Sequence, residues 1–156
     1  MELDELLESL EPRKPGEWEL KTTLRRNNYK VRDVSNDSYY WNKDIDLIAT
    51  NNRTNNVSTI EVKWDRRIAE TGNFYIEFYN PRSRNSKGWF CFCEADLLAY
   101  GDANKKVFYM IRVPELKKYI EENESQLEVK GTWDGSKGYI LPMAAATPLI
   151  FETIVI

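Results

Sequence analysis

Carboxylates and one lysine recur at short spacing in the first half of the chain. Asp44 and Asp46 stand two residues apart, and the tripeptide Glu61-Val62-Lys63 follows after a polar stretch. Carboxylates that converge repel one another unless they share a cation, and hard oxygen ligands favour Mg²⁺ or Mn²⁺. A lysine ammonium beside such a site can orient a water molecule or neutralise charge that develops on a phosphate. Taken alone, Glu61 and Lys63 also fit an exposed ion pair on the solvent face of a strand.

Three strands are predicted to position these side chains. The predicted strands cover residues 29–34, 44–50 and 57–63, and the polar run 51–56 joins the last two as a hairpin. Side chains alternate along a strand, so Glu61 and Lys63 share one face. On adjacent antiparallel strands, side chains that face the same way approach to about 5 Å. We therefore expect Asp46 to lie beside Glu61, with Asp44 on the same face.

The remaining patterns predict further helices and strands without internal repeats. Helices are predicted at residues 2–11, 17–27, 94–100 and 114–123, and strands at residues 74–79, 89–93, 107–113 and 139–141 and at the C-terminal end. A chain of 156 residues has the size of one ordinary domain. The mixture predicts a single α/β (α+β) domain over residues 1–156, with a mixed central sheet flanked by helices.

The composition excludes several classes of chemistry. The sequence contains no histidine, which removes Ser-His-Asp and Cys-His catalysis and the usual zinc sites. Cys91 and Cys93 lack a second Cys or His pair, and we expect buried free thiols of a reducing compartment rather than a mutual disulfide. Residues 1–11 carry five carboxylates and no long apolar stretch, which predicts neither a secretory signal nor a membrane span. We expect a cytoplasmic protein with no membrane partner.

The distribution of charge favours a local anion-binding face. The net charge is −3, whereas proteins that bind nucleic acid are commonly basic overall. The basic residues nevertheless cluster as Arg25, Arg26, Lys30 and Arg32, as Lys63, Arg66 and Arg67, and as Arg82, Arg84 and Lys87. Arg66 and Arg67 directly follow Lys63, so we expect them to contact phosphates, with solvated loop charges as the alternative.

The acidic residues and the lysine resemble a known nuclease motif. Asp46, a turn and the E-V-K tripeptide at residues 61–63 are similar to the D…(E/D)xK core of the PD-(D/E)XK nuclease superfamily. Ile45 stands where the family usually has a proline, which leaves Asp44 and Asp46 both open as the principal metal ligand. In element order the resemblance covers roughly residues 18–119.

A second segment extends the resemblance. Residues 71–77 read T-G-N-F-Y-I-E and resemble a T-G-N-x-x-x-E segment of some phage and bacterial members, which makes Glu77 a further candidate. The resemblance implies a restriction-endonuclease-like fold in which Asp46, Glu61, Lys63 and Glu77 are catalytic and Asp46, Glu61 and Asp44 bind the metal. The alternative to a catalytic Glu77 is a carboxylate that lies between Tyr75 and Tyr79 and simply faces water.

The function that the resemblance implies is hydrolysis of phosphodiester bonds with Mg²⁺, for which Mn²⁺ can substitute. It favours DNA over RNA as the nucleic-acid partner. A chain of 156 residues leaves little room for a separate target-recognition domain, so we expect endonucleolytic cutting that is structure-selective or of weak sequence specificity. The expected nucleic-acid-binding residues are Arg66, Arg67, Arg25, Arg26, Arg82 and Arg84. A homodimer and a virus-encoded protein that acts in the host cell both stay open. The alternatives are a nuclease-fold protein that binds nucleic acid or a protein without cutting, and a small acidic interaction protein.

Trp41 and Trp64 bracket the predicted site in the sequence. We expect both to pack over the sheet edge, with base stacking as the alternative for any ring that is exposed.

Overall fold

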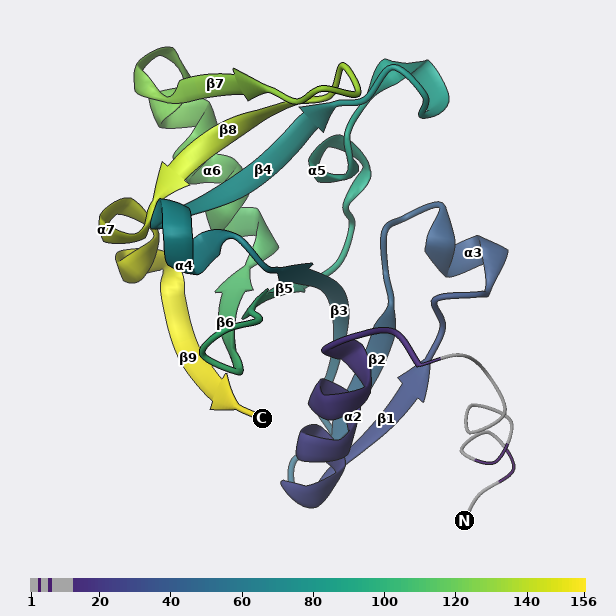
Figure 1. Ribbon diagram of the computed structural model, residues 1–156. Coiled ribbons are helices and arrows are strands. Elements are labelled where there is room, and N and C mark those ends of the chain that lie inside the picture. The colour runs from purple at the N-terminus through teal and green to yellow at the C-terminus, as the bar shows by residue number, and fades with distance from the viewer. Residues whose placement is uncertain (1–2, 4–5, 7–12) are drawn as a thin grey trace.

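The fold consists of two sheets with helices packed around them. The computed structural model describes residues 3, 6 and 13–156, so the predicted helix at residues 2–11 lies outside the described residues apart from Leu3 and Leu6. Six strands form the larger, mixed sheet in the order β1-β2-β3-β5-β6-β9, and three form the smaller sheet in the order β4-β8-β7. Figure 1 shows the smaller sheet at the top of the view and helix α2 at the bottom. The predicted mixed sheet with flanking helices is confirmed at this level.

Helices and strands alternate along most of the described chain. The strands of the larger sheet are β1 (Tyr29–Asp33), β2 (Leu47–Asn51), β3 (Val57–Asp65), β5 (Leu97–Asp102), β6 (Val107–Arg112) and β9 (Ile150–Val155). The smaller sheet contains β4 (Asn73–Tyr79), β7 (Glu128–Gly131) and β8 (Lys137–Pro142). The helices are α2 (Glu17–Arg26), α3 (Ser38–Trp41), α4 (Ile68–Thr71), α5 (Trp89–Phe92), α6 (Val113–Asn123) and α7 (Met143–Ala146), and single 3₁₀ turns are η1 (Arg84–Ser86), η2 (Glu124–Gln126) and η3 (Thr147–Leu149).

The first three strands form the predicted antiparallel meander. β2 pairs with β3 in a register that sets Leu47 opposite Ile60. The tight turn between them places Asn55 in the left-handed region with φ 60°, a conformation that asparagine tolerates better than most residues. From β3 the chain crosses through α4, β4 and α5 before β5 returns parallel to β3. This crossover carries the smaller sheet's first strand over one face of the larger sheet.

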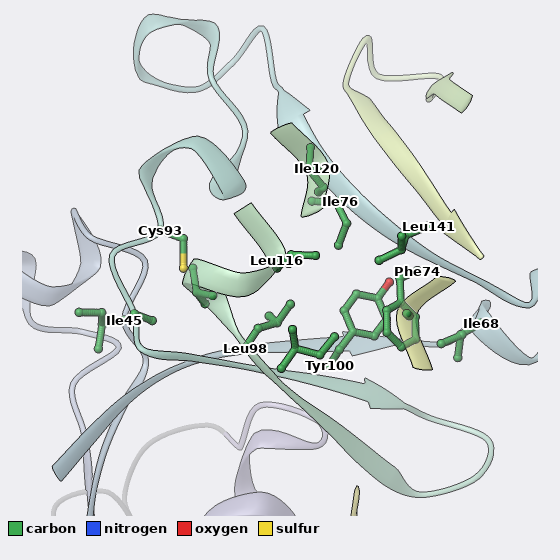
Figure 2. Packing of buried hydrophobic residues seen from close by; sticks show 14 of the residues in the cluster. Ile45, Ile68, Phe74, Ile76, Cys93, Leu98, Tyr100, Leu116, Ile120 and Leu141 are labelled. Carbon is green, nitrogen blue, oxygen red and sulfur yellow. The ribbon is translucent and has the colours of Figure 1, made fainter. Parts of the chain in front are cut away.

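Apolar side chains cover both faces of the larger sheet. On one face, Leu20 and Leu24 of α2 pack on Leu47, Ile60 and neighbouring strand residues. On the other face, residues of β5 meet α6 and the smaller sheet (Figure 2), and this cluster includes Phe74, Ile76, Leu98, Leu116 and Leu141. The α2 stripe follows the helical spacing that the sequence predicts. The larger sheet is therefore a middle layer.

Two predicted elements between β4 and β6 are wrong. Residues 89–93 were expected to form a strand, but Trp89–Phe92 form the short helix α5 after Gly88. Residues 94–100 were expected to form a helix, but Leu97–Asp102 form β5 in the middle of the larger sheet. A short apolar run fits either element by its periodicity, and here hydrogen bonding to β3 and β6 on both sides decides for a strand. As a consequence Cys91 is exposed and Cys93 is buried, whereas side chains two residues apart in a strand would lie on the same face.

Strand β7, at Glu128–Gly131, was not predicted either, because its side chains are all exposed and show no apolar alternation. The other predicted helices and strands between residues 17 and 156 are present, with ends that shift by a few residues. Among the described residues, no helix combines the length and the apolar character needed to cross a membrane.

Candidate active site

The hairpin of β2 and β3 brings Asp46 and Glu61 side by side. The paired register of β2 and β3 ends with Leu47 opposite Ile60, and Asp46 immediately precedes β2. The Asp46 N–H donates to the Ile60 carbonyl at 2.9 Å, and the Val62 N–H donates to Asp46 Oδ2 at 2.8 Å. The Asp46 carboxylate is thus held against the backbone of β3, one residue from Glu61.

Glu61 and Lys63 form a close ion pair on the face that the strand alternation predicts. Lys63 Nζ lies 2.9 Å from Glu61 Oε1, and the two side chains are 32% and 5% exposed. Burial raises the pKa of Glu61 to about 8, opposed by Lys63 and assisted by the negative charge of Asp46. Burial alone would lower the pKa of Lys63, but Glu61, Asp46 and Asp44 outweigh it and raise that pKa. The Lys63 ammonium therefore stays charged, and burial favours the protonated form of the neighbouring Glu61 carboxyl.

Asp44 joins the same electrostatic cluster. Its backbone adopts φ 51°, in the left-handed region, just before the extended chain of β2. Burial raises the pKa of Asp44 to about 6; the positive charges of Lys63 and Arg84 oppose the shift, while Asp46 and Glu77 add to it. These effects place Asp44 within electrostatic reach of both strands of the hairpin.

Glu77 reaches the cluster from β4 of the smaller sheet. Its Oε1 accepts a hydrogen bond from Asn80 Nδ2 at 3.4 Å. Gly88 lies against the Glu77 backbone, where any Cβ would collide with the Glu77 carbonyl. The segment after β4 thus folds back closely on the strand end that carries Glu77.

Glu17 is a charged residue near the site that sequence reasoning missed. It lies buried in the first turn of α2, and burial, followed by the charges of Asp46 and Asp33, raises its pKa to about 8. A signal for it is present in the sequence, because Glu17 begins the stripe that continues through Leu20 and Leu24 at helical spacing.

The carboxylates that could hold a metal ion are few. No group of three or more His, Cys, Asp or Glu side chains within the described part of the chain is arranged to hold a metal ion. Mg²⁺ is commonly bound by only one or two carboxylates and completes its shell with water and substrate phosphates. The pair Asp46 and Glu61 matches that donor set. Burial and the negative charge of Asp46 raise the pKa of Glu61, and a bound cation would favour its ionised form.

An open cleft of about 650 Å³ begins at the site and runs between the larger sheet and the smaller one. Lys63, Arg66 and Arg67 line it from β3 and the start of α4, and Glu77 and Trp89 line it from the other side. Lys63 Nζ lies 4.8 Å from the centroid of the Trp89 ring, within the range of a cation–π contact. The cleft therefore combines positive charge, aromatic surface and the Glu77 carboxylate, and it meets the other acidic residues of the site through Lys63, the partner of Glu61.

The predicted basic residues are not all brought together. Arg25 Nη2 donates to the Val31 carbonyl at 2.9 Å, and Arg25 and Arg26 lie at the end of α2 opposite to Glu17. Arg84 lies close enough to oppose the pKa shift of Asp44. The structure thus assembles Arg66, Arg67 and Arg84 near the site and leaves the α2 pair elsewhere.

The two tryptophans that bracket the site differ in exposure. Trp64 packs against Phe108, with ring centroids 5.4 Å apart, and belongs to the core under α2. Trp41 is exposed on α3. The expected packing holds for Trp64 and not for Trp41.

No family model, curated protein or solved structure matches this chain.

Proposed function

We propose that this protein is a Mg²⁺-dependent nuclease that hydrolyses phosphodiester bonds, with DNA as the preferred substrate. The observation that carries the proposal is the hydrogen bonding of Asp46 to the β3 backbone on either side of Glu61, with Lys63 paired to Glu61 at 2.9 Å. These are the residues of the D…ExK resemblance. A surface ion pair does not account for them, because Glu61 is only 5% exposed and its pKa is raised.

The arrangement of elements supports a restriction-endonuclease-like fold. A helix, α2, precedes three antiparallel strands, and the chain then crosses over to β5, which runs parallel to β3. That order agrees with the core expected of the PD-(D/E)XK superfamily, with Asp46 immediately before the second strand and Glu61 on the third. The smaller sheet is an addition to that core and supplies Glu77.

Asp46 and Glu61 would hold the Mg²⁺ ion, with Asp44 as a further carboxylate. The chemistry that such an ion supplies is charge neutralisation at the scissile phosphate and a lowered pKa for the attacking water. Lys63 stays charged and is one-third exposed at the mouth of the cleft, so it can hold the phosphate or orient the water. Glu77 faces the same space from β4.

The cleft suits a phosphate backbone as substrate. Arg66 and Arg67 are exposed and line it next to Lys63, and guanidinium groups bind phosphate oxygens through paired hydrogen bonds. The acidic cluster would repel such a backbone in the absence of a cation. Metal and nucleic acid are therefore expected to bind together.

The decisive experiment is incubation with supercoiled double-stranded DNA and with circular single-stranded DNA, each with and without Mg²⁺ or Mn²⁺. We expect cleavage only with the ion, loss of cleavage in Glu61→Gln, and wild-type cleavage in Glu121→Gln, which removes an exposed charge on α6. A parallel RNA substrate tests the preference for DNA. Absence of cleavage together with absence of Mn²⁺ binding by calorimetry would replace the proposal with a non-catalytic binding protein.

A further inference from the structure

The hairpin that joins β7 to β8 carries the most exposed large hydrophobic side chain in the described part of the chain. Trp133 stands at its tip with 97% of its surface exposed. A ring that stays in water contributes nothing to the core, so packing within the chain does not account for this residue. Single exposed apolar residues are nevertheless common on protein surfaces, and the support and surroundings of the ring distinguish this one.

Polar contacts hold the turn that presents Trp133. The Thr132 N–H donates to the Ser136 carbonyl at 2.8 Å, and the Ser136 N–H donates to the Asp134 carboxylate at 3.0 Å. Asp134 also forms an ion pair of 2.5 Å with Arg82, from the segment that follows β4. Figure 1 shows the β7–β8 tip beside that segment. The ring is therefore presented on a turn that is tied to a second part of the chain.

The surroundings of Trp133 are basic although the whole chain is acidic. Residues 77–88 and 128–137 contain five basic side chains and three acidic ones, a local charge of +2 against a net charge of −3 for the protein. All five basic residues are exposed: Arg82, Arg84, Lys87, Lys130 and Lys137. Proteins that bind single-stranded nucleic acid combine aromatic rings, on which bases stack, with basic side chains that contact the phosphates.

The hairpin is continuous with the cleft of the candidate active site. Lys130 and Thr132 line the same cleft as Lys63 and Glu77, and Trp133 directly follows Thr132. A strand whose phosphate reaches Lys63 can therefore extend along the cleft to the hairpin tip. A ring can stack only on a base whose face is open, at an unpaired nucleotide, a gap or an end.

We propose that Trp133 stacks on an unpaired base of the nucleic acid bound in this cleft and makes the protein selective for substrates with single-stranded segments. This inference rests on the proposed function, in that the strand in the cleft is the strand to be cut. Lys130 and the exposed arginines hold the backbone on either side of the stacked base. Trp133 thus sets which structures bind, and the acidic cluster acts on the bound strand.

The test is binding of fluorescein-labelled oligonucleotides by anisotropy with Ca²⁺ in place of Mg²⁺, so that no turnover is needed. Removal of one base–aromatic stack is expected to weaken binding of oligo-dT and of a gapped duplex by about 5- to 100-fold in Trp133→Ala. Trp133→Phe should retain most of the affinity, and a blunt duplex should bind both variants as it binds the wild type. The dependence of affinity on salt should not change, because no charge is removed.

Two controls separate stacking from charge and from general loss of surface. Phe151→Ala removes an exposed aromatic ring on β9, outside the cleft, and should bind like the wild type. Lys130→Ala should lower the slope of log affinity against log salt by roughly 0.7. Quenching of tryptophan fluorescence by oligo-dT should be reduced in Trp133→Phe, which reports on the ring itself.

Several results would overturn the inference. One is that Trp133→Ala binds oligo-dT with wild-type affinity, and another is that this variant loses as much affinity for a blunt duplex as for oligo-dT. The inference also fails if the wild type binds no oligonucleotide, or if Trp133 is needed for binding to phosphatidylserine vesicles and not to DNA. The two proposals fail separately. If DNA binding depends on Trp133 but the wild type cuts no DNA with Mg²⁺ or Mn²⁺, the nuclease proposal is refuted and the stacking role is kept. If the wild type cuts DNA and Trp133→Ala binds it unchanged, the stacking role is refuted and the nuclease proposal is kept.

Discussion

Replacing Glu17 by glutamine should stabilise the protein, and increasingly so as the pH rises. The Glu17 carboxyl is buried in the first turn of α2, near Asp33 and Asp46. Burial and these two charges raise its pKa from 4.5 to about 8, and a hydrogen bond with Asp33 also favours the protonated form. Glutamine removes the charge but keeps an N–H donor for Asp33, so the contact survives.

The size of the effect follows from the two pKa values of Glu17. A folded-state pKa above the unfolded value gives stability that is present below pH 4.5 and is lost as the pH rises through about 8. At about 1.4 kcal/mol per pKa unit, the folded state is penalised by at most about 3 kcal/mol at pH 7 and by less than about 1 kcal/mol at pH 5. At pH 7 the folded Glu17 carboxyl is mostly protonated, so glutamine gives up no interaction of a negative charge with the helix dipole. We expect a net gain of up to about 3 kcal/mol at pH 7.

The assay is urea unfolding of wild type and Glu17→Gln from pH 5 to pH 8, in EDTA, followed by tryptophan fluorescence. Glu19→Gln is the matched control, because it removes an exposed charge from the same turn of α2 and should change stability by less than about 0.5 kcal/mol at every pH. A stabilisation by Glu17→Gln that does not grow between pH 5 and pH 8 would refute the buried-carboxyl argument.

Three further predictions concern the site and the thiols. Lys63→Ala should lower cleavage by more than about 100-fold while calorimetry shows Mn²⁺ affinity unchanged or slightly raised, since the ammonium repels the ion; full activity would contradict its role. Arg66→Ala combined with Arg67→Ala should weaken DNA binding and lower the salt slope by roughly 0.7–0.9 for each phosphate that the variant no longer binds, and an unchanged slope in anisotropy would show solvated arginines. A thiol reagent should modify Cys91 rapidly and Cys93 only after unfolding, because Cys93 is buried and burial raises its pKa to about 12; two fast thiols in the native protein would show that this packing is wrong.

The sequence by itself determined those parts of the protein that depend on neighbouring residues. The alternation of Glu61 and Lys63 along β3, the polar turn before it and the helical stripe of α2 are local patterns, and each appears in the structure. The closeness of Asp46 to Glu61 follows from the same short hairpin, because a short turn sets which residues of the two strands meet. Strand, turn and facing residue could therefore be predicted together.

Tertiary structure alone decided the features that depend on segments far apart in the chain. Residues 97–102 are a strand because β3 and β6 pair with them on both sides, which their own periodicity does not show. Glu17 reaches Asp46, and Lys130 reaches the cleft of Lys63, only through the packing of separate elements. Periodicity records which face of an element is buried, but not which element covers it. That choice depends on pairing energies summed over the whole chain, so the cleft and the exposed ring of Trp133 come from the fold.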